Sequence, residues 1–236
     1  MPDRYYSAEK IDGPTVTLAD TEAHHLLHVM RAQPGLELIV FDGHGGEFAG
    51  QIAACQRSTV EVTRGKRQAI ERELPFQLTL AVPLPKGDRQ RWLVEKSVEL
   101  GVTRIVPIST ARTASKGDAK NKLERYVIEA SKQCGRNRLM AIAAPIGWSA
   151  WLAEATAGQR LLAHPGSQPL GDIQHEADRE TCIAIGPEGG FTDEEVAQAA
   201  NAGWQTVGLG ERILRIETAA AACVAAIALH LGREMS

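Results

Sequence analysis

The sequence is poor in cysteine and has only one histidine cluster. Its four cysteines, Cys55, Cys134, Cys182 and Cys223, stand singly, without the close pairs of zinc sites or the framework of a secreted disulfide-rich domain. We therefore expect reduced thiols, with Cys182 and Cys223 packed in the core. The histidines at residues 24–28 are joined by no carboxylate or second histidine pair that completes a ligand set, so we expect no metal.

Long apolar runs are also missing. The longest, residues 219–229, is well short of the roughly 20 residues that a membrane-spanning helix needs, and the first residues lack the apolar core of a signal peptide. We therefore expect a cytoplasmic protein. Hydrophobic residues make up 44% of the chain and charged residues 23%, as in ordinary globular proteins, which excludes a largely disordered chain.

Two familiar phosphate-binding motifs are absent. The chain contains neither GxGxxG with an acidic residue about 20 positions on, as nucleotide-dependent oxidoreductases have, nor GxxxxGK[ST]. It has instead two glycine-bearing turns, residues 186–190 and 208–210, each after a short strand-like run. Such turns are expected to converge at the carboxyl edge of one parallel sheet, where a flat, polar small molecule binds.

Acidic charge is in slight excess, but it is unevenly spread. The formal net charge is −3, and residues 141–236 hold 5 Lys and Arg against 12 Asp and Glu. Residues 86–138 hold 13 basic against 6 acidic residues. Such an excess of basic residues is typical of a surface that binds a polyanion. A solvated helical face explains the count equally well. We take as candidate RNA contacts Arg4, Arg31, Lys86, Lys116, Arg136, Asn137 and Arg138.

The first part of the chain shows strand-like runs at residues 15–18, 36–41, 47–52 and 58–62, two of them separated by a glycine-rich loop. This spacing predicts a small β-barrel. Arg64, Lys66, Arg67 and Arg72 then crowd a predicted linker. We place the domain boundary there, giving domains at residues 1–70 and 71–236.

The second part alternates strands and helices. Strands are expected at 77–82, 104–108 and 160–163, and helices at 89–100, 118–134 and 150–155, two of them closed by Gly101 and Gly135. Thr192 and Glu195 form a capping box for a further helix that ends at Gly203. An alanine-rich helix over 217–231 follows. This rhythm predicts an α/β fold with a parallel sheet and helices on both faces.

GPEGGFTDEE at residues 186–195 and GLGERILRIETAAAA at 208–222 resemble the carboxyl-terminal signature of the SPOUT methyltransferases. Further motifs carry the resemblance over nearly the whole chain, and within the class they are most similar to the RsmE family: RYY at 4–6, HHLLHVMR at 24–31, EKSVELG at 95–101 and EASKQCGRNR at 129–138. The resemblance implies S-adenosylmethionine-dependent methylation of N3 of one uridine in 16S ribosomal RNA of the small subunit. It also implies a PUA-like RNA-binding barrel, a carboxyl-terminal trefoil knot and a homodimer.

By the same resemblance, S-adenosylmethionine should lie among three loops and the start of the last helix. Backbone groups would hold its adenine, so a β-branched residue at Gly189 or Gly210 should impair cofactor binding more than folding. The residues implied are Leu162, His164, Pro165, Gly186, Pro187, Glu188, Gly189, Gly190, Leu209, Gly210, Ile213, Leu214, Arg215, Thr218 and Ala219.

Three charged residues are candidates for catalysis. Arg215, beside the cofactor loop, would stabilise charge that develops on the uracil oxygens, and Glu188 or Glu217 would remove the N3 proton if burial raises its pKa. Both glutamates also have a structural explanation, Glu217 at a helix N-terminus and Glu188 as an anchor of its own loop. A noncatalytic RNA-binding or ribosome assembly factor that binds the cofactor remains the alternative function.

Overall fold

The computed structural model of the chain describes residues 3–113, 120–174 and 180–233. It divides into two compact units, one of Met1–Glu73 with Ser131–Leu139, the other of Leu74–Ala130 with Met140–Ser236. The first break falls close to the boundary that we expected at residue 70. Residues 131–139, which the sequence placed in the second domain, pack with the first unit because Arg136 and Asn137 bond to groups there.

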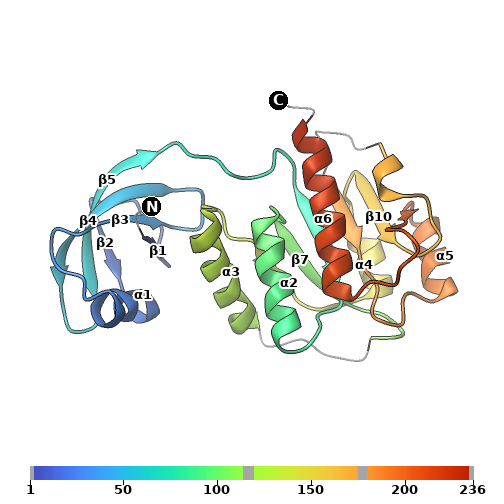
Figure 1. Cartoon of the computed structure of the whole chain (residues 1–236), viewed down its shortest axis with the longest axis horizontal. Helices are drawn as coiled ribbons and strands as arrows, with labels where there is room; N and C mark the ends of the chain where they lie inside the picture. Colours follow the sequence, from blue (N-terminus) through green and yellow to red (C-terminus); the bar gives the residue numbers. More distant parts are fainter. Residues whose placement is uncertain (1–2, 114–119, 175–179, 234–236) are drawn as a thin grey trace. The chain divides into compact units, whose positions relative to one another are not determined.

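The first unit is a five-stranded sheet that curls into a half-barrel (Figure 1). Its order is β1-β3-β4-β5-β2, antiparallel except for the parallel pair β1–β3. Alternate residues such as Val60 and Val62 face a core shared with Leu26, as expected for a sheet with one buried face. The strands are β1 (Arg4–Tyr6), β2 (Thr15–Leu18), β3 (Glu37–Phe41), β4 (Glu47–Cys55) and β5 (Val60–Gln68).

The region expected to be a linker is a strand over most of its length. β5 pairs with β4 as far as Gln68 opposite Glu47, so Arg64, Lys66 and Arg67 belong to the sheet, and our linker prediction is wrong for these three residues. Their polar character reflects an exposed strand end. The HHLLHVMR segment begins at the last residue of α1 (Asp20–His24) and continues as a π-helical turn (His25–Val29), and we predicted neither element.

The second unit is an α/β layer structure with a seven-stranded sheet in which every pairing is parallel. The main order is β12-β10-β11-β6-β7-β8, and β9 pairs with β7. The parallel α/β fold that we predicted is therefore confirmed. The strands are β6 (Leu78–Val82), β7 (Arg104–Ser109), β8 (Ala141–Ile142), β9 (Ile146–Gly147), β10 (Gln159–Ala163), β11 (Thr181–Ala184) and β12 (Gln205–Val207).

Helices cover both faces of this sheet. α2 and α6 pack side by side on one face, and α4 and α5 lie on the other (Figure 1). No helix within the described residues is long and apolar enough to cross a membrane. The helices are α2 (Asp88–Glu99), α3 (Lys120–Cys134), α4 (Trp148–Glu154), α5 (Asp193–Asn201) and α6 (Ile216–Arg233), with a 3₁₀ turn at Leu170–Asp172.

The local signals that end and begin these helices are confirmed. Gly101, Gly135 and Gly203 adopt left-handed φ values of 88°, 84° and 78° just after three helices, the conformation that favours glycine at a helix end. Thr192 and Glu195 form the predicted capping box at the start of α5. The Glu195 carboxylate also accepts the amide of Ala111 at 2.8 Å, so this cap ties α5 to the chain after β7.

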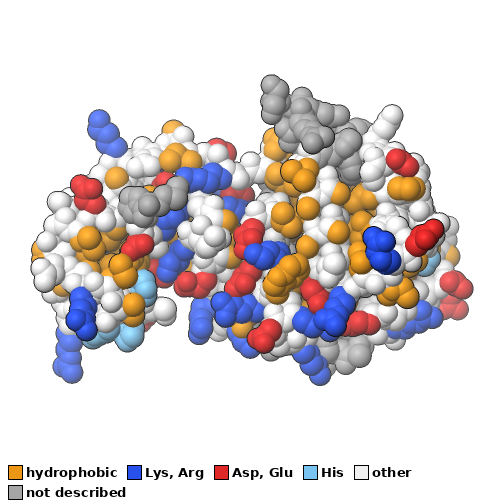
Figure 2. Space-filling model, in the orientation of Figure 1, with side chains coloured by type: hydrophobic (Ala, Val, Ile, Leu, Met, Phe, Trp, Pro, Cys, Tyr) orange, Lys and Arg blue, Asp and Glu red, His pale blue; other side chains and the backbone are white. Residues whose placement is uncertain are grey.

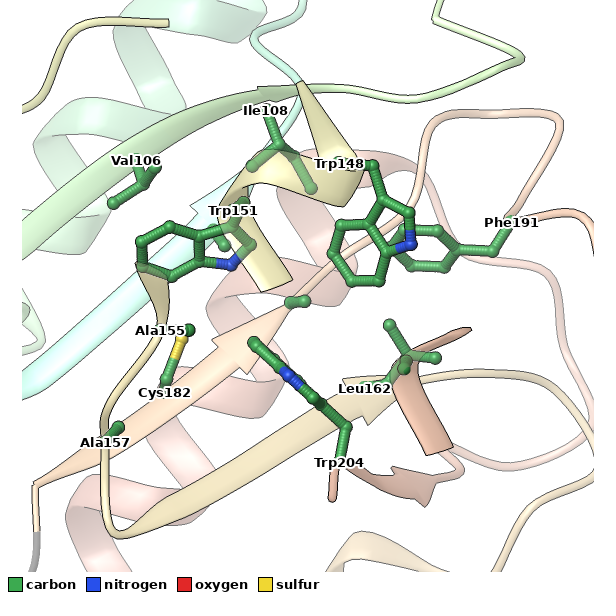
Figure 3. Close-up of a cluster of buried hydrophobic side chains, with 13 residues drawn as sticks. Val106, Ile108, Trp148, Trp151, Ala155, Ala157, Leu162, Cys182, Phe191 and Trp204 are labelled. Carbon is green, nitrogen blue, oxygen red and sulfur yellow. The ribbon is translucent and has the colours of Figure 1, made fainter. Parts of the chain in front are cut away.

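An aromatic cluster packs between the sheet and the helices α4 and α5 (Figure 3). The ring of Trp148 lies 4.7 Å from that of Phe191 and 5.9 Å from that of Trp204, measured between centroids. Cys182 is buried against the same cluster, as expected, and Cys223 is buried in α6. Because Phe191 follows directly after the glycine turn 186–190, this cluster fixes one end of that turn.

Candidate functional site

Three loops converge at the carboxyl ends of the neighbouring parallel strands β10, β11 and β12. Together with the first turns of α6 they enclose a cavity of about 230 Å³. Ligands of open α/β sheets bind at this edge because the loops leave the sheet there with free backbone groups. The cavity therefore lies where the two glycine turns of the sequence predicted a small-molecule site.

Most of the predicted cofactor residues line this cavity: His164, Pro165, Gly186, Pro187, Glu188, Gly189, Gly190, Leu209, Gly210, Ile213, Leu214 and Ala219. Leu162, Arg215 and Thr218 are not among the lining residues; Leu162 is fully buried within β10. The sequence analysis missed other lining residues, namely Ala163, Ile185, Phe191, Val207 and Arg212. The apolar residues among them lie at or just after the ends of the predicted strands. Their positions could therefore have been predicted from the sequence.

The glycines of the site leave its wall open. Gly190 and Gly210 have φ values of +68° and +92°, and a Cβ built on either would meet no heavy atom within 4 Å. Within the described part of the chain, the backbone N–H groups of Leu209 and Leu214 donate to no protein acceptor. Backbone N–H groups that are accessible and have no protein acceptor can donate to the acceptor atoms of a bound heterocycle.

Arg89 of α2 connects the glycine turn to the last helix. Its Nε and one Nη donate to the two carboxylate oxygens of Glu217 at 2.9 and 3.0 Å, and the same Nη donates to Glu188 at 2.8 Å. Glu217 stands in the first turn of α6 and its side chain is 10% exposed, whereas that of Glu188 is 58% exposed. The forked guanidinium thus joins three segments that are far apart in the sequence.

The ion pairs of this clamp shift the pKa values of Arg89 and Glu188. Hydrogen bonds from Arg89 lower the pKa of Glu188, and the carboxylates of Glu217 and Glu188 raise the pKa of Arg89. The condition under which we considered Glu188 as a base, a raised pKa, is not met in this structure. Glu188 instead anchors its own loop, which was the structural explanation for it.

Two further arginines stand at the cavity. Arg112 donates to the carbonyl oxygen of Gly189 at 2.6 Å, so the glycine turn is held on one side by Arg112 and on the other by Arg89. Arg212 lines the cavity and is exposed. Arg215 is exposed too, and its backbone carbonyl accepts the amide of Ala219 at 2.9 Å.

Comparisons with known proteins agree with the site. An RNA methyltransferase domain matches residues 72–228, and an RNA methyltransferase PUA domain matches residues 18–63. The chain is 37% identical over 229 residues to ribosomal RNA small subunit methyltransferase E of a Synechocystis species, covering 93% of this chain and 74% of the relative. The chain belongs to the ribosomal RNA small subunit methyltransferase E family. The member from Bacillus subtilis is 31% identical, covering 92% and 90% of the two chains.

Solved structures of the family share the fold over both units. The enzyme from Neisseria gonorrhoeae bound to S-adenosyl methionine superimposes with a TM-score of 0.89 at 34% identity, covering 98% of each chain. A methyltransferase from Legionella pneumophila, in complex with the same cofactor, gives 0.86 at 30% identity over 99% and 98% of the two chains. The resemblance drawn from the sequence motifs is therefore confirmed.

Three of the seven predicted RNA contacts, Arg4, Arg136 and Asn137, bond to groups within the first unit. Arg4 donates to Glu47 at 2.7 Å and to Asn137 at 2.6 Å. Arg136 is only 4% exposed and pairs with Glu73 through both sides of its guanidinium. The family motif GRNR thus contributes two of its side chains to the packing of the first unit, and in this conformation these donors are occupied.

Three others, Arg31, Lys86 and Arg138, are available to solvent. Arg31 and Lys86 are exposed, and Lys86 follows β6, whose carboxyl end lies beside that of β11. Arg138 is 55% exposed, although one Nη donates to the carbonyl of His44 at 3.3 Å. Lys116 lies outside the described residues. These positions keep their place as candidate RNA contacts of a family member.

Proposed function

We propose that the chain catalyses S-adenosylmethionine-dependent methylation of small-subunit ribosomal RNA, at N3 of one uridine of 16S RNA. The observation that carries this proposal is the cavity formed by the glycine turns 186–190 and 208–210 at the carboxyl edge of the sheet. The relative from Neisseria gonorrhoeae, which shares the architecture over 98% of its chain, is named ribosomal RNA small subunit methyltransferase E and is bound to S-adenosyl methionine.

The residues present fit this cofactor. The spare amides of Leu209 and Leu214 suit the nitrogen acceptors of adenine, and Leu209, Ile213 and Leu214 supply apolar contact along the same wall. The bound cofactor would supply a methyl group on a cationic sulfur, which needs no phosphate cradle. The chain's own task is then to hold donor and acceptor in line and to exclude water.

Arg215 is the residue that we propose for stabilising the charge on the uracil oxygens, because its exposed side chain follows the cofactor loop directly. Arg212, which lines the cavity, is a second cation within the same segment. Glu188 and Glu217 both accept hydrogen bonds from Arg89, which lowers the pKa of Glu188. A base role for either requires that Arg89 first release it, which a pH–rate profile of Glu188→Gln tests.

We also propose that the protein works as a homodimer through α2 and α6. Trp92 of α2 and Leu229 of α6 are exposed apolar side chains, and Figure 2 shows hydrophobic side chains along α6. A dimer would cover them, and light scattering after gel filtration tests it. The trefoil knot implied by the family stays a prediction, because strand order alone does not report threading.

The decisive experiment is methyl incorporation from labelled S-adenosylmethionine into small ribosomal subunits from cells that lack this protein, followed by identification of the modified nucleoside. We expect 3-methyluridine with the wild-type chain and none with a folded Gly189→Val or Arg215→Ala variant. Cofactor binding without any turnover on subunits or naked RNA would contradict the proposal and favour the noncatalytic assembly factor.

A further inference from the structure

The first unit contains a basic hollow that shares no residue with the cofactor cavity, and none of the predicted RNA contacts is among the residues that line it. Its volume is about 750 Å³. Four cationic side chains line it against two carboxylates, those of Asp12 and Asp42. We define the basic hollow by its side chains Lys10, His44, Phe48, Arg64, Lys66 and Arg67.

The two carboxylates offer the hollow little negative charge. Asp42 is turned into its own loop, where Oδ1 accepts the amides of His44 at 2.9 Å and Gly46 at 3.1 Å. Asp12 pairs with Lys10 at 3.3 Å, and both side chains are exposed. Lys66, Arg64 and Arg67 form no ion pair with any carboxylate of the described residues. Their charge is therefore left for an outside anion.

A β-bulge aims the two arginines into the same space. Phe48 pairs with Arg67 and Gly50 with Arg64, so two steps along β4 match three along β5. Without the extra residue, positions 64 and 67 would point to opposite faces, since side chains alternate along a strand. The bulge places both on the face of Phe48, a re-aiming that bulges commonly provide next to functional sites.

The arginines retain donors for a ligand. Arg64 lies over the ring of Phe48, with its guanidinium carbon 5.2 Å from the ring centroid, and its buried Nε has no partner within the described residues. Arg67 uses one Nη on the carbonyl of Gly45 at 3.2 Å. A guanidinium has five N–H donors in a planar fork that matches phosphate oxygens, so each arginine has donors left over.

We propose that the basic hollow binds the phosphodiester backbone of the RNA substrate, outside the cavity that holds the reacting base. The inference rests on the proposed function, since it takes that RNA as the occupant. Cations without base-reading partners recognise the charge and spacing of phosphates and not their sequence. The hollow would thus supply affinity and register, while the cavity of the second unit selects the reacting base.

The test is a charge deletion in the full-length protein, Lys66→Gln with Arg67→Gln. Both side chains are exposed, whereas Arg64 also packs on Phe48, so this pair is the safer change for folding. The matched control is Arg57→Gln, an exposed arginine in the turn that joins β4 and β5 at the other end of the same hairpin. RNA binding is measured by fluorescence anisotropy without cofactor, over a series of salt concentrations.

We expect the double variant to bind RNA about 10-fold more weakly and to lower the slope of log K against log salt by roughly 1 to 1.5, which is two phosphate contacts at about 0.7 each. The KM for subunits should rise with kcat and cofactor affinity unchanged. Arg57→Gln should behave as wild type. Equal losses in both variants, or none in either, would overturn the proposal.

Two further outcomes separate the possibilities. Displacement of RNA from the wild-type hollow by uridine monophosphate at a similar phosphate concentration would show a site for a single phosphate, and would overturn the assignment to an RNA strand. RNA binding that is lost in the double variant, without methyl transfer by the wild type, would contradict the proposed function and support the basic hollow.

Discussion

Replacement of Arg89 by methionine is the most informative change in the second unit. Methionine keeps much of the aliphatic stem but removes three charge-assisted hydrogen bonds, two to Glu217 and one to Glu188. The Glu217 carboxylate, 10% exposed, then has no cation beside it. We expect Arg89→Met to lower both the free energy of unfolding of this unit and its affinity for S-adenosylmethionine.

The size of the effect follows from burial. Breaking a buried ion pair costs about 3–5 kcal/mol, and an exposed pair contributes about 0.2–1 kcal/mol. The side chain of Arg89 is 38% exposed, and of its two partners only Glu217 is nearly buried. Water can therefore solvate part of the carboxylate charge that the substitution leaves unpaired. We expect a loss of about 1–3 kcal/mol in stability. Cofactor affinity should fall roughly 10-fold, because Arg112 alone then holds the turn.

Urea unfolding followed by tryptophan fluorescence measures the stability, since all four tryptophans belong to the second unit. Calorimetric titration measures cofactor binding. The control is Arg91→Met on the same helix, which removes a solvent-accessible pair with Glu95 and a cation contact with the ring of Tyr126 and should change neither quantity much. An Arg89→Met protein with the wild-type unfolding midpoint and wild-type cofactor affinity would refute the clamp.

The pH dependence gives a second check on the same clamp. Arg89 lowers the folded-state pKa of Glu188 below its usual 4.5. A carboxyl group with a depressed folded pKa adds stability above its unfolded pKa and loses it as pH falls through the folded pKa. The stability difference between wild type and Glu188→Gln should therefore be present near neutral pH and disappear in acid. A difference that grows below pH 4.5 would contradict the assignment.

Three other predictions follow from the geometry. Gly210→Val forces a β-branched residue to a φ of +92° and should cost about 1–2 kcal/mol of unfolding free energy while abolishing measurable cofactor binding by calorimetry. Arg136→Met leaves the nearly buried carboxylate of Glu73 without this partner and should destabilise the first unit by about 3 kcal/mol, seen as faster hydrogen exchange in its strands. Burial raises the pKa of both Cys182 and Cys223, the latter to about 12, so iodoacetamide should label only the two other cysteines in the native protein.

Local signals in the sequence were sufficient for much of the second unit. Glycine after a helical run, a capping box and a strand followed by a glycine turn each depend on neighbours within a few residues. Gly101, Gly203 and Thr192 therefore lie where we expected them. The cavity could be predicted for the same reason, because parallel strands bring the loops at their carboxyl ends together whatever the details of packing.

Features that depend on long-range pairing were missed. The bulge between β4 and β5 shifts the alternation of buried and exposed residues by one position. The sequence at the end of β5 therefore lacks the regular alternation of a strand, and we predicted a linker there. Arg89 and Glu217 are 128 residues apart, and neither residue alone signals the other. The assignment of 131–139 to the first unit likewise depends on Glu73 and Asn137 finding distant partners.

The arginines show why a count of basic residues locates an RNA surface poorly. Arg136 sits in the basic GRNR motif, yet moving its guanidinium from Glu73 to a phosphate would leave a nearly buried carboxylate unpaired, at a cost of about 3–5 kcal/mol. Arg67 would give up one exposed hydrogen bond to a carbonyl, worth about 1 kcal/mol. Leaving its protein partner therefore costs Arg67 less free energy than it costs Arg136. We expect a phosphate backbone to bind the basic hollow in preference to Arg136. Replacing Arg67 should therefore weaken RNA binding more than replacing Arg138, which pairs with Glu71 at 3.9 Å.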